Sequence, residues 1–122
     1  MSAYSRNKGS RAEVEVCAAL GRLGIEAITS RNARAGTQGG HDIICPDLPV
    51  LLEVKNASRD ELPRWIDQAR DQADDTAPGA VLHKRRGKAR AEEWFLTMQL
   101  DDFVALVADL RTRPLDDAEV PF

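Results

Sequence analysis

Two charged residues interrupt an otherwise apolar segment, residues 50–55, and both are of types that do chemistry. Side chains alternate between the two faces of a strand, so Glu53 and Lys55 share one face. The opposite face is directed into a core and carries Val50, Leu52 and Val54. Asp42 lies 11 residues before Glu53, on a second short apolar segment that a hairpin can bring alongside. The sequence therefore predicts an aspartate, a glutamate and a lysine at one place.

Asp42, Glu53 and Lys55 together provide the groups needed to hydrolyse a phosphodiester. Two neighbouring carboxylates repel each other unless a divalent cation neutralises them, and Mg²⁺ is commonly held by one or two carboxylates together with phosphate oxygens. A bound cation lowers the pKa of its water, while a lysine can orient that water or meet the charge that develops on phosphate. A Glu-x-Lys pair on a strand is also common as an exposed ion pair, and that alternative stays open.

Glu13 is a third candidate carboxylate. Ser10 and Glu13 have the spacing of a capping box, which predicts that a helix begins at Ser10. Glu13 also begins an apolar stripe that continues at Val16, where an idle charge is unfavourable. We therefore expect Glu13 to cap the helix and also to face the site formed by Asp42 and Glu53.

The set of Glu13, Asp42, Glu53 and Lys55 resembles the pattern of the PD-(D/E)xK nucleases. Within that superfamily, the chain is most similar to the archaeal-type Holliday junction resolvases and their phage relatives. The resemblance covers about residues 8–107, which is most of the chain. Further positions that carry it are Lys8, Gly9, Leu20, Gly24, Ile25, Arg31, Ile43, Ile44, Trp65, Gln68 and the segment 80–83.

This resemblance implies a metal-dependent endodeoxyribonuclease that acts as a homodimer on branched DNA. Asp42, Glu53 and the backbone carbonyl of Val54 would bind Mg²⁺, for which Mn²⁺ would substitute. Glu13 would reach the metal site through water or hydrogen bonds, and Lys55 would contact the nucleophilic water. Two such sites would cut opposed strands of a four-way junction, and no small-molecule cofactor is expected.

Basic and polar side chains are expected to hold the DNA backbone. The resemblance implies contacts from Arg31 and from the glycine-rich loop after it, which we expect to be mobile. The densest basic run, residues 83–90, predicts salt-sensitive phosphate binding. No aromatic residue stands within this run, so we expect contacts to shape and backbone without base stacking. The predicted DNA-binding set is Lys8, Arg11, Arg31, Arg34, Thr37, Gln68, Lys84, Arg85 and Arg86.

Hydrophobic periodicity and turn residues predict the elements that position these side chains. After a basic arm over residues 1–8, we expect helices at 10–24, at 60–75 and from Asp101 onward, and strands at 25–31, 41–45, 50–55, 80–84 and 94–98. The helix between the third and fourth strands permits a parallel crossover. The predicted fold class is α/β, with a mixed five-stranded sheet flanked by helices, and the resemblance implies a restriction-endonuclease-like fold. One nuclease domain spans residues 1–113, followed by an acidic tail over 114–122.

Two apolar helix faces are expected to form core or to provide a dimer surface. The second helix has a stripe of Leu62, Trp65, Ile66, Ala69 and Ala73. The last helix is expected to be capped by Asp101, with an apolar face formed by Phe103, Leu106, Val107 and Leu110.

Composition places the chain among ordinary soluble domains, with 122 residues of which 43% are hydrophobic and 30% charged. No apolar run approaches the roughly 18 residues that cross a bilayer, and the N-terminal residues have no signal-peptide pattern. We therefore expect the cytoplasm of a bacterium or of a phage-infected host, with no membrane partner and with Cys17 and Cys45 reduced and buried. The net charge of −3 arises from the acidic segment 101–122, so it does not exclude a DNA partner.

Two other functions remain open. The same chemistry can serve a flap, end-processing or restriction-like nuclease, because the chain departs from the resolvase pattern at two positions. Val14 stands where arginine is common, and Thr37 is the hydroxyl nearest to a common serine. A non-catalytic DNA-binding module on the same fold is the second alternative, although the four site residues are all intact.

Overall fold

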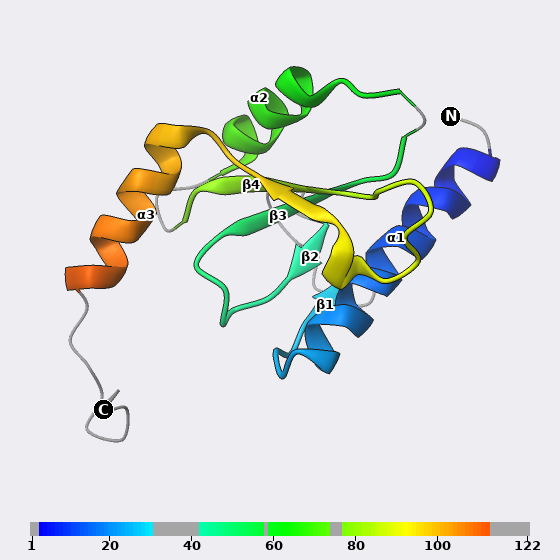
Figure 1. Cartoon of the computed structure of the whole chain (residues 1–122), viewed down its shortest axis with the longest axis horizontal. Helices are drawn as coiled ribbons and strands as arrows, with labels where there is room; N and C mark the ends of the chain where they lie inside the picture. The colour runs from blue at the N-terminus through cyan, green and yellow to red at the C-terminus, as the bar shows by residue number, and fades with distance from the viewer. Residues whose placement is uncertain (1–2, 31–41, 58, 74–76, 113–122) are drawn as a thin grey trace.

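The elements follow the predicted order of helix, three strands, helix, two strands and helix in the computed structural model, which describes residues 3–30, 42–57, 59–73 and 77–112. Side chains are described from Arg11 onward. In chain order the elements are α1 (Ala3–Arg22), β1 (Ile28–Thr29), β2 (Ile43–Ile44), β3 (Leu51–Lys55), α2 (Leu62–Gln72), β4 (Gly79–His83), the short 3₁₀ helix η1 (Ala91–Glu93), β5 (Phe95–Thr97) and α3 (Leu100–Thr112) (Figure 1). The α/β class is confirmed, and the strands are shorter than predicted.

Within the described residues the strands form two sheets, so the single five-stranded sheet predicted from the sequence is wrong. β1 pairs antiparallel with β2, and Ile28 lies opposite Ile44. In the other sheet β4 is central, parallel to β3 and antiparallel to β5. Glu53 lies beside Val81 in the parallel pair, and Lys55 lies beside His83. The predicted parallel crossover through α2 is therefore confirmed.

β2 lies against β3, but the described residues show no backbone ladder between them. The connection between the two strands contains Pro46 and Pro49, and neither proline has an N–H to donate. In addition, the backbone N–H of Val54 donates to Oδ2 of Asp42 at 2.8 Å. A side chain thus takes a donor that ladder pairing requires, and the hairpin predicted for these strands is replaced by this contact.

α1 begins at Ala3 and not at Ser10, so the predicted capping box and the basic arm over residues 3–8 are wrong. Extending a helix adds one hydrogen bond for each residue fixed, whereas a new start must meet the cost of nucleation. A single Gly9 costs only about 1 kcal/mol in a helix interior, so the helix continues through it. The predicted end at Gly24 is confirmed: its φ is +85°, its N–H donates to Gly21, and the N–H of Ile25 donates to Leu20.

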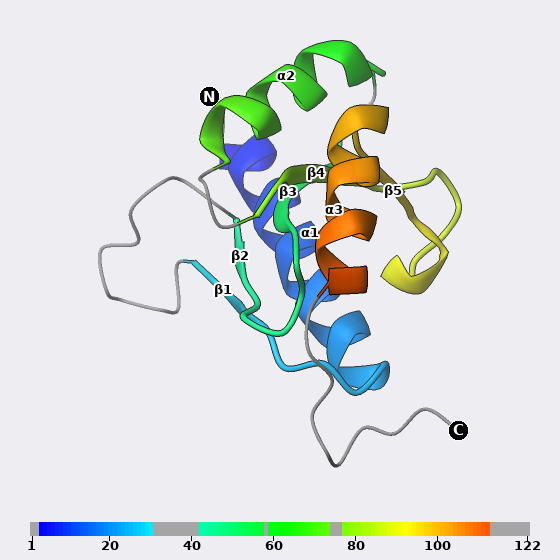
Figure 2. The ribbon, with the colours of Figure 1, turned by 90° about the vertical axis from the view of Figure 1, so that its left-hand side faces the viewer.

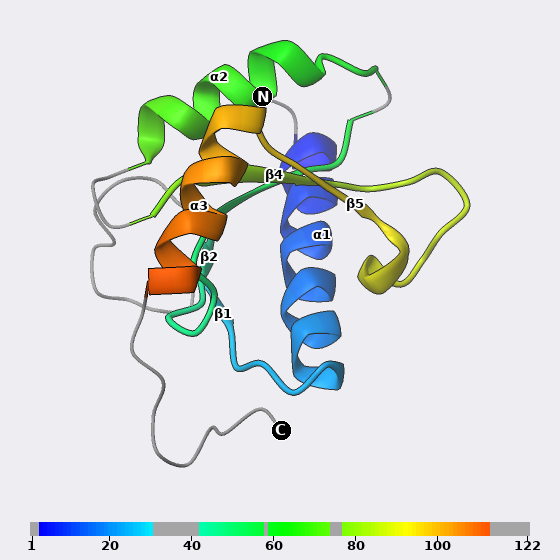
Figure 3. The ribbon, with the colours of Figure 1, turned by 60° about the vertical axis from the view of Figure 1, so that its left-hand side comes forward.

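Two apolar clusters cover the opposite faces of β3 and β4, and Figures 2 and 3 show α1 and α2 on opposite sides of these strands. The cluster on the α1 side contains Val16 together with the predicted core residues of β3, namely Val50, Leu52 and Val54. The cluster on the α2 side consists of Trp65, Ala69 and Val81, with Leu62 and Ile66 packed against it. The predicted stripe of α2 is therefore confirmed as core.

α2 lies very close to the first residue of β4. A Cβ built on Gly79 would come within 2.2 Å of the Ala69 carbonyl oxygen, so only glycine fits this position without a shift of the backbone. At the other end of α2, Asp60 Oδ1 accepts the N–H of Leu62 at 2.9 Å. The Asp60 contact is local to the start of α2, and the close approach of Gly79 to Ala69 brings the helix against β4.

α3 has no buried residue, and it begins one residue earlier than predicted. Asp101 therefore lies in the first turn and not at the cap, and its carboxylate accepts hydrogen bonds from Gln99 and from the N–H of Asp102. Leu106 packs against the main core, whereas Phe103 and Leu110 of the predicted apolar face remain 49% and 44% exposed. Of the two alternatives for this face, core or dimer surface, core therefore holds at Leu106 and not at Phe103 or Leu110.

Several predictions lie outside the described residues: the glycine-rich loop with Arg31, Arg34 and Thr37, and the acidic tail. The side chain of Lys8 also lies outside them. Cys17 and Cys45 are free, as expected, but half-buried rather than buried. Among the described helices, none is both long and apolar enough to cross a membrane.

Candidate active site

Glu53 is the centre of the candidate site. It lies on β3 and is only 6% exposed, although it belongs to the face opposite the main core. Burial, followed by the nearby charge of Asp42, raises the pKa of Glu53 to about 7, and the attraction of Lys55 offsets part of this rise. A buried carboxylate of this kind needs a cation or a proton, because its solvation by water has been lost.

Asp42 immediately precedes β2 and reaches across to β3. Its Oδ2 accepts the N–H of Val54 at 2.8 Å, which fixes the aspartate beside the residue that follows Glu53. The sequence predicts that Asp42 and Glu53 lie together. The contact between Asp42 and the backbone of Val54 brings them together, in place of pairing between β2 and β3. Two carboxylate oxygens and the backbone of β3 thus meet at one edge of the site.

Lys55 links β3 to α2 on the same face. Its Nζ lies 3.6 Å from Oε1 of Glu53 and donates to Oε1 of Gln68 at 2.9 Å. Gln68 was predicted as a DNA contact, and here its side chain holds the lysine. One turn further along α2, the Oε1 atom of Gln72 is buried without a hydrogen-bond partner.

Glu13 is buried inside α1, with 8% exposure, so it is not a capping residue. Its charge contributes to the raised pKa of Glu53, which places Glu13, Asp42 and Glu53 within electrostatic reach of one another. Among the described residues no group of three or more His, Cys, Asp or Glu side chains is assembled to hold a metal. The donors present are carboxylate and carbonyl oxygens, which are the ligands that Mg²⁺ and Mn²⁺ prefer.

A basic loop, residues 84–90, continues from the end of β4 next to Lys55, whose carbonyl accepts the N–H of Lys84 at 2.9 Å. The guanidinium of Arg85 lies 4.3 Å from the ring centroid of Phe95, which is 54% exposed. The sequence analysis found no aromatic partner for this loop because Phe95 lies outside the basic run. Strand pairing brings it back, since His83 lies opposite Phe95 in the β4–β5 ladder.

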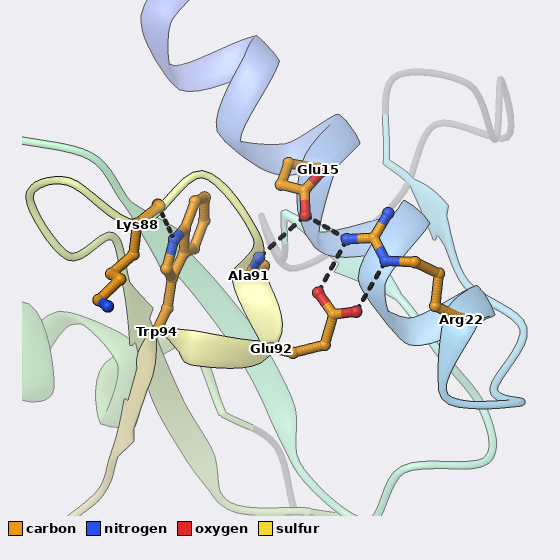
Figure 4. A network of polar contacts seen from close by, with 6 residues as sticks. All are labelled: Glu15, Arg22, Lys88, Ala91, Glu92 and Trp94. Carbon is orange, nitrogen blue, oxygen red and sulfur yellow. Dashed lines mark hydrogen bonds and ion pairs between the residues drawn. The ribbon is translucent and has the colours of Figure 1, made fainter.

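The basic loop is anchored to α1 by a polar network that sequence reasoning missed (Figure 4). Oε2 of Glu15 accepts the N–H of Ala91 at 2.9 Å and a guanidinium N–H of Arg22. The same guanidinium makes two further bonds to Glu92, at 2.7 and 2.8 Å. Within the same stretch, Trp94 Nε1 donates to the carbonyl of Lys88 at 2.7 Å. The contacts of Glu15 and Arg22 join α1 to residues more than 60 positions further along the chain, so no local sequence pattern predicts them.

The predicted DNA-binding residue Arg11 lies beside this loop. With Glu15, Asn56, Lys84 and Trp94 it lines a shallow cavity of about 240 Å³ between α1 and the loop. Arg86 lines a neighbouring cavity that includes Lys55. The described members of the predicted DNA-binding set thus come from α1, α2 and the basic loop. Of these, Gln68 contacts Lys55 and Arg86 shares a cavity with it.

Comparison of the chain with protein-family models, with curated proteins and with solved structures gives no match.

Proposed function

We propose that this protein is a Mg²⁺-dependent endonuclease of the PD-(D/E)xK type that cuts branched DNA, with four-way junctions as its substrate. The observation that carries the proposal is a buried glutamate, Glu53, whose pKa is raised to about 7 beside a second carboxylate and a lysine. Burial of such a cluster costs stability and is typical of functional sites. The proposal includes a restriction-endonuclease-like arrangement of the sheet and a cytoplasmic location.

In the proposed reaction, Asp42, Glu53 and the carbonyl of Val54 would hold the cation, and Glu13 would support it through water or hydrogen bonds. The cation supplies charge neutralisation and an acidified water. Lys55 orients the attacking water or stabilises the charge that grows on the phosphate, and Gln68 keeps the lysine in place. Lys84, Arg85 and Arg86 hold the backbone of the DNA, together with Lys8, Arg11, Arg31, Arg34 and Thr37.

The proposed enzyme acts as a homodimer, because the described residues of one chain form one such site and paired cuts require two. The apolar residues that α3 leaves exposed fit contact with a second copy, since a monomer gains nothing from them. They are Leu100, Phe103, Val104 and Leu110. Val104→Glu is expected to convert the dimer to a monomer in size-exclusion chromatography with light scattering, and an unchanged mass would place the contact elsewhere.

The test is cleavage of an end-labelled four-way junction, a matched duplex, a flap and a single strand, with Mg²⁺, Mn²⁺ or chelator. Glu53→Gln and Lys55→Ala are compared with Glu26→Gln, which changes an exposed glutamate. Symmetric nicks on the junction that need metal and disappear only in the two site variants are expected. Cleavage of flap or linear DNA instead would keep the chemistry and change the substrate. Junction binding without cleavage under any metal would identify a non-catalytic DNA-binding module.

A further inference from the structure

A cavity of about 460 Å³ opens at the carboxyl ends of β3 and β4, next to the carboxylate site. Its size is within the range of about 300–1,000 Å³ that is usual for pockets that hold one small ligand. Trp65 and His83 form an aromatic wall, with ring centroids 6.2 Å apart and ring planes tilted by 49°. Trp65 is only 6% exposed, whereas His83 is half-buried, and burial lowers the pKa of His83.

The rest of the lining is polar and mostly cationic. Lys55, Lys84 and Arg86 provide three positive charges, and Asn56 provides an amide. Asp60 provides one carboxylate, whose Oδ1 already accepts the N–H of Leu62. An aromatic wall, cations and a few polar groups together match the parts of one nucleotide: a flat base, an anionic phosphate and polar base edges. A membrane surface or an apolar peptide would not need this combination.

The cavity is continuous with the surface assigned to the DNA backbone. Asn56 and Lys84 line both this cavity and the shallower one beside Arg11. On its other side the aromatic row continues from His83 to the exposed ring of Phe95, with centroids 6.1 Å apart. A DNA strand that follows the basic loop therefore passes the mouth of the cavity.

We propose that this cavity receives one unstacked nucleotide of the branched DNA, with its base against the half-buried ring of His83, which Trp65 backs, and its phosphate against Lys84 and Arg86. The inference rests on the proposed DNA substrate and adds a source of selectivity to it. Extruding a base costs least where stacking and pairing are already disturbed, as at a branch point. The cavity thus favours branched over continuous duplex DNA, without any readout of sequence.

Ala57 lines the cavity and is itself exposed, so Ala57→Phe fills the space without disturbing the core. Ala57→Ser keeps the cavity open, and Ala18→Phe adds the same ring to an exposed position of α1. Binding of each variant to a four-way junction with 2-aminopurine at the branch point is measured in the presence of chelator, so that the DNA is not cut. Fluorescence of the probe reports whether its base leaves the stack. A blunt duplex of the same length serves as the second ligand.

Wild type, Ala57→Ser and Ala18→Phe are expected to change the probe's fluorescence on binding. Ala57→Phe is expected to abolish that change and to weaken junction binding about tenfold, in line with the loss of one stacked base, with duplex affinity unchanged. An unaltered signal in Ala57→Phe, or equal loss on the duplex, would overturn the inference. Wild-type cleavage in Mg²⁺ without a fluorescence change would refute the cavity alone, whereas the expected fluorescence pattern without cleavage would refute the nuclease alone. Failure to bind the junction would overturn both.

Discussion

Glu53→Gln is predicted to stabilise the metal-free protein at alkaline pH. The pKa of Glu53 is raised from 4.5 to about 7, and each unit corresponds to about 1.4 kcal/mol, so ionisation of this buried group costs about 3 kcal/mol of folding stability. The cost is absent at low pH, where the carboxyl is protonated in both the folded and unfolded chain. It develops as the pH rises from about 4.5 through about 7, and it is fully present at pH 8. Glutamine cannot ionise and therefore avoids it.

Urea denaturation in chelator at pH 5 and pH 8 measures this effect, with Glu26→Gln as the control. The free energy of unfolding of wild type is expected to fall by about 2.5 kcal/mol relative to that of Glu53→Gln between the two pH values, because a small part of the cost is already present at pH 5. Added Mg²⁺ at pH 8 is expected to restore stability to wild type and not to the variant, because a ligand of the folded state stabilises it. If the free energies of unfolding of wild type and Glu53→Gln change in parallel with pH, the pKa of Glu53 is not raised by burial and by the charge of Asp42.

Four further predictions follow from particular contacts. Gly79→Ala is expected to destabilise the fold by about 1–3 kcal/mol in urea denaturation, because its Cβ would meet the Ala69 carbonyl, and an unchanged midpoint would contradict this. Gln72→Met is expected to stabilise by about 1 kcal/mol, since it removes a buried oxygen without a partner. Arg22 lowers the pKa of Glu92 to about 2, so their ion pair persists at pH 4. The same guanidinium contacts Glu15, which accepts the N–H of Ala91. Hydrogen exchange at Ala91 is therefore expected to be faster in Arg22→Gln than in wild type at pH 4, and this difference is expected to vanish near pH 2, where Glu92 is protonated. Arg86→Gln is expected to lower the salt slope of junction binding by about one, and an identical slope would exclude a phosphate contact.

The local order of elements could be predicted from the sequence because it depends on short-range patterns. Alternation placed Val50, Leu52 and Val54 in the core, and the positive φ at Gly24 ends α1 as expected. The division into two sheets could not be predicted in the same way. It depends on a contact between residues 12 apart, in which the Asp42 side chain accepts the backbone N–H of Val54. The predicted start of α1 at Ser10 was wrong. The capping-box spacing of Ser10 and Glu13 is present in the sequence, but the helix has already begun at Ala3 and continues through these residues.

The basic loop shows a second limit of sequence reasoning. Its charge is evident from the run of arginines and lysines, but its aromatic neighbour Phe95 and its anchors on α1 are not. Arg22 and Glu92 are 70 residues apart, and Glu15 and Ala91 are 76 apart, so only the folded chain brings them together. The basic run itself contains no aromatic residue, as the sequence shows, but the folded chain brings Phe95 beside Arg85.

The two parts of the proposed activity, metal-dependent cleavage and DNA binding, depend on contacts of different sequence separation. The carboxylate site is held by short connections, since Asp42 reaches Val54 over 12 residues and Lys55 reaches Gln68 over 13. The basic loop depends instead on the Arg22–Glu92 pair and on Glu15, which are remote from Glu53 in sequence. Glu15 and Arg22 belong to α1, which lies on the opposite side of β3 and β4 from α2. Loss of the anchor therefore leaves the charges around Glu53, and with them metal-dependent stabilisation, largely intact, while DNA affinity falls. Because the two parts depend on different contacts, substitutions in the basic loop can change which DNA is bound, while Asp42, Glu53 and Lys55 keep the cleavage chemistry.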